Sequence, residues 1–225
     1  MNVLTLLGGG LLGLGVLGSL HAGTNNFYVP TFRGEPGAQA GYWEDFTIPF
    51  GSIGNLPNFG TGINAMLTQT APGAIITGGA AGNIYNMQNA SAFTVNYSSS
   101  LPVRTVVLQT RTIGTELAYD SIRLNYGFEG GSLPADRVEL DRSPFGGGGG
   151  PQGFFVSSAW EWDLSSLNVG TFSITFNAAE PSLSFDAMTL DTQLVPEPST
   201  WALLGMGGFA VLFASRYRRH HTTGR

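Results

Sequence analysis

Hydrophobic and polar residues alternate along several short stretches of this chain. The clearest alternations place apolar side chains at every second position: Ile122, Leu124, Tyr126 and Phe128, then Phe172, Ile174 and Phe176, and then Leu183 and Phe185. A period of two is typical of a β-strand that buries one face. The run Val103–Thr110 is rich in β-branched residues and predicts a further strand.

Other apolar segments lie between clusters of Gly, Pro, Asn and Ser, which are typical of turns and loops. They predict strands at Trp43–Ile48, Ala74–Thr77, Ala92–Tyr97, Arg137–Asp141 and Phe154–Leu164. The glycine-rich run Pro144–Pro151 predicts a flexible loop. We therefore expect residues 23–194 to form an all-β domain, a two-sheet antiparallel sandwich of jelly-roll type.

The C-terminal end of the chain follows a different pattern. The short motif Val195-Pro196-Glu197-Pro198 precedes an uncharged segment, Trp201–Ser215, and a cluster of arginines. A helix over that segment would measure roughly 22 Å, which is short for a membrane span. Its predicted membrane-anchor residues are Trp201, Leu203, Leu204, Phe209, Val211, Leu212 and Phe213. The positive-inside rule predicts that Arg216, Arg218 and Arg219 form a cytoplasmic stop, followed by a cytoplasmic tail at residues 220–225.

These three parts, over residues 195–219, resemble the PEP-CTERM sorting signal of exported bacterial proteins. The resemblance implies a partner, an exosortase-type membrane protease that removes the transmembrane helix. It also implies a transient stay in the inner membrane, with the domain on the periplasmic side, and a final location at the cell surface or outside the cell. A plain C-terminal anchor that is never cleaved is the alternative.

The N-terminal end is also expected to be a targeting segment. Residues Val3–Leu20 are uncharged, and small residues follow at Ala22-Gly23. This pattern predicts a signal peptide at residues 1–22 that is cleaved after Ala22. A retained N-terminal anchor is the alternative, but the seven glycines between Gly8 and Gly23 disfavour a stable helix.

Composition excludes several classes of chemistry for the domain. Residues 23–195 contain no His, Cys or Lys, which removes Ser-His-Asp and Cys-His catalysis, Schiff-base chemistry and ordinary zinc sites. Six arginines against fourteen carboxylates give this part a net charge of −8, which argues against a nucleic-acid partner. Carboxylate chemistry remains, either as a glycosidase-like pair or as oxygen ligands for calcium.

The sequence Trp160-Glu161-Trp162-Asp163 offers two candidate sites. In a strand, Trp160 and Trp162 share one face, where they would form either a ligand-binding platform for sugar rings or part of a core-facing stripe. Glu161 and Asp163 share the other face, with Cα atoms roughly 6.5–7 Å apart. Neighbours that point the same way rarely flank a scissile bond, so a solvated strand face is the simpler interpretation.

The remaining acids are expected to be structural. Asp136, Glu139 and Asp141 lie among arginines, which predicts local ion pairs. Asp186 and Asp191 flank the last predicted strand and raise the possibility of a structural calcium, although no calcium-loop motif is present. We therefore predict no catalytic residue, no metal ligand and no cofactor.

Four further segments are similar to those of a group of uncharacterised PEP-CTERM proteins. They are Phe32–Gly37, Thr115–Ser121, Trp160–Leu164 and Ser182–Thr192. This resemblance implies no activity. The sequence thus favours an exported, non-catalytic protein of the cell surface or extracellular matrix. One alternative is a module that binds carbohydrate or exopolysaccharide, and a second is a carboxylate-dependent glycoside hydrolase or lyase.

Overall fold

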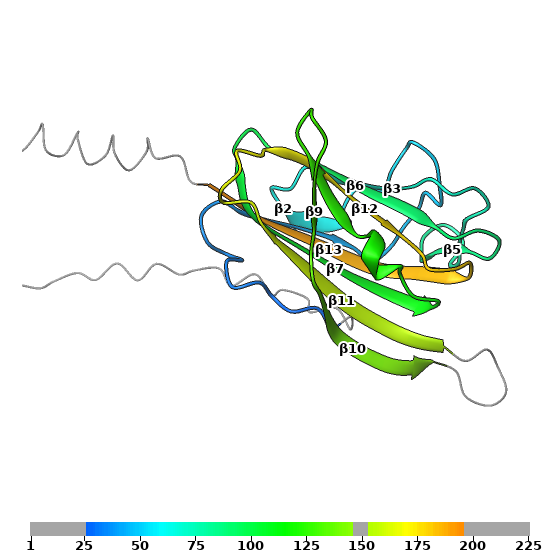
Figure 1. Ribbon diagram of the computed structural model, residues 1–225. Helices are drawn as coiled ribbons and strands as arrows, with labels where there is room; N and C mark the ends of the chain where they lie inside the picture. Colours follow the sequence, from blue (N-terminus) through cyan, green and yellow to red (C-terminus); the bar gives the residue numbers. More distant parts are fainter. Residues whose placement is uncertain (1–25, 146–152, 196–225) are drawn as a thin grey trace, which may run out of the picture.

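A computed structural model describes residues 26–145 and 153–195. Within these residues the fold is all-β and consists of two antiparallel sheets, as expected; the only helical element among them is a short 3-10 helix, η1 (Tyr119–Ser121). Figure 1 shows the two sheets as stacked layers. The predicted signal peptide and the predicted transmembrane helix lie outside the described residues.

The large sheet has eight strands. Its main path runs through β10 (Arg137–Phe145), β11 (Gly153–Asp163), β7 (Val103–Gly114), β13 (Leu183–Leu194), β1 (Ala38–Trp43) and β2 (Phe59–Thr61). Beside the first residues of β13 lies β5 (Ile84–Asn86), which pairs with β4 (Ile75–Ile76). The long strands β7 and β13 pair over almost their whole length and form the centre of the sheet.

The small sheet has five strands. Their order is β3 (Ala65–Gln69), β6 (Ala92–Ser98), β12 (Thr171–Asn177), β8 (Arg123–Tyr126) and β9 (Gly131–Pro134). The predicted alternation places Phe172, Ile174 and Phe176 on the inner face, where all three are buried. Alternation thus identified which face of this sheet lies against the other layer.

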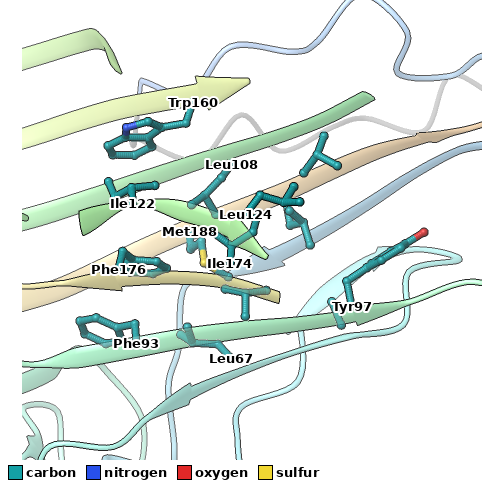
Figure 2. Close-up of a cluster of buried hydrophobic side chains, with 14 of the residues drawn as sticks. Leu67, Phe93, Tyr97, Leu108, Ile122, Leu124, Trp160, Ile174, Phe176 and Met188 are labelled. Carbon is teal, nitrogen blue, oxygen red and sulfur yellow. The ribbon is translucent and has the colours of Figure 1, made fainter. Parts of the chain in front are cut away.

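Apolar side chains from both sheets meet in one core, part of which Figure 2 shows. The ring of Phe185 in the large sheet lies 4.5 Å from that of Phe93 and 5.7 Å from that of Phe176, both in the small sheet. Phe46 packs on Phe185 from a loop. These contacts hold the two layers face to face, in the arrangement of a β-sandwich.

An N-terminal arm, residues 26–37, lies against the outer face of the large sheet. The backbone N–H of Tyr28 donates to the side-chain carbonyl of Gln109 at 2.9 Å, and the amide of Gln109 donates back to the carbonyl of Tyr28 at 3.0 Å. Further along the arm, the guanidinium of Arg33 donates two hydrogen bonds to the buried carboxylate of Asp191, at 2.7 and 2.6 Å. The arm therefore covers polar groups of β7 and β13 that would otherwise face water.

The strand predicted at Trp43–Ile48 is wrong. Trp43 is the last residue of β1, and Phe46 forms only an isolated bridge with Gly82. The side-chain carbonyl of Asn55 accepts hydrogen bonds from the backbone N–H groups of Thr47 and Ile48, at 2.9 and 3.0 Å. The side chain of Asn55 thus accepts the backbone hydrogen bonds that a neighbouring strand would otherwise accept, so this segment needs no strand pairing.

Two other strand boundaries differ from expectation. The strand containing Leu124 ends at Tyr126, so Phe128 lies in a turn and not on a strand. Pro144 and Phe145, predicted to begin a loop, are the last residues of β10, and residues 146–152 of that predicted loop lie outside the described residues.

Candidate functional site

The predicted sugar-stacking residues Trp160 and Trp162 lie in the core. Their exposed fractions are 1% and 3%, and that of Trp43 is 0%. Trp162 donates its ring N–H to the carbonyl of Leu133 at 3.1 Å, whereas the ring N–H of Trp160 is buried without a partner among the described residues. The platform prediction is therefore wrong for this pair, because both rings are turned toward the opposite sheet, and the core-stripe interpretation is confirmed.

Glu161 and Asp163 face solvent on the opposite side of β11. The carboxylate of Asp163 accepts a hydrogen bond from the backbone N–H of Ser165 at 2.8 Å. Hydrogen bonds from Ser165 hold the pKa of Asp163 below its usual value. The carboxylate of Asp163 is therefore ionised and bonded locally at the end of β11.

The acids near β10 form ion pairs, as predicted for Glu139. Arg142 binds Glu139 at 3.1 Å and also Glu116 at 2.6 Å, while Arg137 binds Glu139 at 2.6 Å. Glu116 precedes η1 and accepts a hydrogen bond from the hydroxyl of Tyr119, whose ring lies 3.8 Å from the guanidinium carbon of Arg137. The cluster therefore ties the η1 segment to the β10–β11 hairpin.

Tyr119 is a poor candidate for a lyase base. Burial and the hydrogen bond to Glu116 raise the pKa of Tyr119 to about 12. A base must lose its proton near the working pH, and a phenol of this pKa keeps it. Arg142 holds the pKa of Glu116 below its usual value, so the carboxyl beside Tyr119 is ionised and bound.

The candidate calcium ligands Asp186 and Asp191 pair with arginines instead. Asp186 lies 3.3 Å from Arg111, and Asp191 is fully buried against Arg33. Among the described residues, no group of three or more His, Cys, Asp or Glu side chains is placed to hold a metal ion. The two aspartates belong to separate ion pairs.

The buried pair predicts a measurable pH dependence. Burial raises the pKa of Asp191 to about 6, and the Arg33 guanidinium opposes part of that rise. In an unfolded chain the same carboxyl titrates near about 3.9. Because the folded-state pKa is higher, the contribution of this group to stability is complete below about pH 4 and declines as the pH rises through about 6.

We therefore expect the unfolding free energy of the wild type, relative to Asp191→Asn, to fall between about pH 4 and about pH 7 and to level off above. Urea denaturation of both proteins across this range measures the difference. A difference that stays constant or grows with pH would contradict the expectation.

A groove on the outer face of the small sheet is the strongest candidate site. It has a volume of about 750 Å³, and its lining comes mainly from β3, β6, β12 and the β8–β9 hairpin. Asn96 lies opposite Met66 on one side and Ser173 on the other, and Ser173 lies opposite Asn125. These four residues form a row across four strands that spans about 14 Å at the usual strand spacing.

An exposed aromatic ring borders this groove. Phe128 lies in the turn between β8 and β9, and its side chain is fully exposed. The turn needs glycines, since Gly127 and Gly130 have φ angles of +69° and +79°. Gly131 is also required, because a Cβ at that position would lie 2.5 Å from the ring of Tyr126. The glycines therefore set the backbone conformation of the turn, and Phe128 projects from it into solvent.

Several polar groups in the groove remain available to a ligand. Within the described part of the chain, the side chains of Asn96 and Ser173 make no hydrogen bond. Asn125 uses its amide N–H to bond Thr175 at 3.1 Å, which leaves its carbonyl free. Asn64 likewise donates to Ser98 at 2.6 Å. An amide both donates and accepts, so this row matches a ligand rich in hydroxyl groups.

Sequence reasoning missed this site for a clear reason. Asn96, Ser173 and Asn125 are ordinary outward-facing strand residues, and only the strand register brings them together. A usable signal existed for Phe128, because Gly127, Gly130 and Gly131 around it indicate a turn better than a strand.

Comparison with known proteins identifies the C-terminal segment. Residues 194–219 match the family described as the PEP-CTERM protein-sorting motif. No curated protein and no solved structure matches the chain. The motif implies a protein that is exported and sorted by an exosortase system. The predicted sorting, anchor and stop residues, apart from Val195, lie outside the described residues. Within the described residues no helix is long and apolar enough to cross a membrane.

Proposed function

We propose that the chain is an exported, non-catalytic protein of the cell surface or extracellular matrix that an exosortase-type protease sorts through its C-terminal segment. The observation that carries this proposal is the match of residues 194–219 to the sorting motif. The absence of His, Cys and Lys from residues 23–195 supports a non-catalytic role. The final strand ends at Leu194, so the folded domain leads directly into the motif.

A jelly-roll type of sandwich belongs to this proposal. The strand order β1-β13-β7-β11 in the large sheet and β6-β12-β8-β9 in the small sheet supports it. The chain crosses between sheets from β6 to β7 and again to β8, and later from β11 to β12 and to β13. The first strand lies beside the last. This connectivity supports an arrangement of two nested Greek keys.

Replacing Pro196, Glu197 and Pro198 together with alanine tests the sorting function. Proline disfavours helix at itself and at the preceding residue, so we expect the motif to be extended and the protease to need that extended peptide. We expect unprocessed protein to accumulate in the membrane fraction and surface protein to be lost. Immunoblots of cell fractions, with an epitope tag on the domain, measure both.

Alanine at Thr222, Thr223 and Gly224 is the matched control, since these residues follow the arginine cluster. Processing of this control should match the wild type. Unchanged maturation of the motif variant would instead support a simple anchor, and full-length wild type that stays in the cytoplasm would refute export.

Polysaccharide binding is the second candidate function. The groove on the small sheet favours it, because an exposed aromatic ring lies there together with the amide of Asn96, the hydroxyl of Ser173 and the free carbonyl of Asn125. The glycoside hydrolase or lyase alternative finds no comparable support among the described residues. Glu161, Asp163 and Tyr119 do not line this groove.

A further inference from the structure

We infer that the groove on the small sheet binds an uncharged polysaccharide, with Phe128 as the stacking ring. This inference rests on the second candidate function above and names the class of ligand. Three properties of the groove carry it: its charge, its hydrogen-bonding groups and its apolar surface.

The charge of the groove selects against acidic chains. None of its fifteen lining residues is an acid or a base. Glu129 stands next to Phe128 in the same turn, and the domain as a whole is acidic. A polymer of uronic acids or sulfated sugars would meet no cation among the lining residues, because Arg123, on the same face of β8, lies outside that lining. A neutral polymer meets neither repulsion nor a desolvated charge.

The hydrogen-bonding groups fit hydroxyls. Asn96, Ser173 and Asn125 lie in register on adjacent strands, so their free amide and hydroxyl groups are spaced by one strand separation, about 4.8 Å. Each amide offers donors and acceptors, and each sugar hydroxyl is both. A row of such groups binds successive hydroxyls along a chain without any need for charge.

The apolar surface of the groove fits the C–H face of a sugar ring. Phe128 is fully exposed, and Leu56 and Met66 add apolar surface on the far side of the groove. Sugar rings present C–H groups on one face and hydroxyls at their edge. A ring stacked on Phe128 therefore places its hydroxyls toward the amide row. Tyr126, packed over Gly131, holds the hairpin that carries Phe128.

Affinity electrophoresis of the full-length protein tests the inference, with the protein held in a zwitterionic detergent that contains no sugar. One set of gels contains a neutral polymer, either dextran or a neutral β-glucan. The other set contains an acidic polymer, either alginate or polygalacturonate. We expect retardation by a neutral polymer, and we expect it to persist when the salt rises from about 0.05 to about 0.5 M. Phe128→Ala should weaken binding about ten-fold, and Asn96→Ala should weaken it several-fold.

Phe50→Ala is the control, because Phe50 is also an exposed phenylalanine but does not line the groove. Equal retardation of Phe128→Ala and the wild type would overturn the site. Retardation by the acidic polymers alone would overturn the ligand class and leave polysaccharide binding intact. Retardation by no polymer would overturn both. A dimer that Phe128→Ala dissociates, detected by sedimentation, would assign the groove to a second copy and also overturn the inference.

Discussion

Replacing Asp191 with alanine is expected to lower the free energy of unfolding by about 3–5 kcal/mol at pH 7. The carboxylate is fully buried and receives two hydrogen bonds from Arg33. Without it, the guanidinium is left nearly buried with only the hydroxyl and ring of Tyr42 as partners among the described contacts. An uncompensated buried charge is among the most destabilising changes a single substitution makes.

Asp186→Ala is the matched control on the same strand. Asp186 and Arg111 are partly exposed and lie 3.3 Å apart, so the loss should be at most about 1 kcal/mol. Urea denaturation of the wild type and both variants measures these values. Equal losses for the two variants would mean that the N-terminal arm does not depend on its buried ion pair.

Phe185→Ala is expected to lower the free energy of unfolding by about 3–5 kcal/mol. Phe185 is fully buried, and its ring contacts Phe46, Phe93 and Phe176. Alanine would leave a cavity between the two sheets that these rigid rings cannot fill. Thermal unfolding followed by near-ultraviolet circular dichroism reports both the stability and the packing of the rings.

Phe50→Ala provides the comparison for this experiment as well. The side chain is exposed, so its loss should change the unfolding free energy by less than about 0.5 kcal/mol. A loss below about 1 kcal/mol for Phe185→Ala would show that the core repacks around the site and that the aromatic cluster does not hold the sheets together.

Strands with clear alternation could be predicted from the sequence. Phe172, Ile174 and Phe176 face the core in β12, and Leu183 and Phe185 begin β13. The strand β1 was missed because Gln39 and Gly41 precede Trp43 on its inner face, so no apolar side chain recurs at every second position. A Cβ on Gly41 would lie 3.0 Å from Ile63 and 3.1 Å from Pro57. Close packing of a glycine leaves no hydrophobic period in the sequence.

The two candidate sites also differ in how clearly they stand out in the sequence. The tryptophans of β11 stood out in the sequence, yet large apolar side chains stabilise a core as readily as they bind a ligand. The groove uses Asn96 and Ser173, which carry no distinctive local pattern. Their importance depends on pairing between strands that are distant in the sequence, and a single sequence does not show that register.

The position of β13 has a consequence for the timing of export. This strand lies between β7 and β1, and it ends at Leu194, where the match to the sorting motif begins. The large sheet therefore stays open until the last residues of the domain are available to pair. In the proposed export route, the membrane protease would meet the motif as the sheet becomes able to close. Completion of the fold and recognition of the tail would then be consecutive steps of one passage through the membrane.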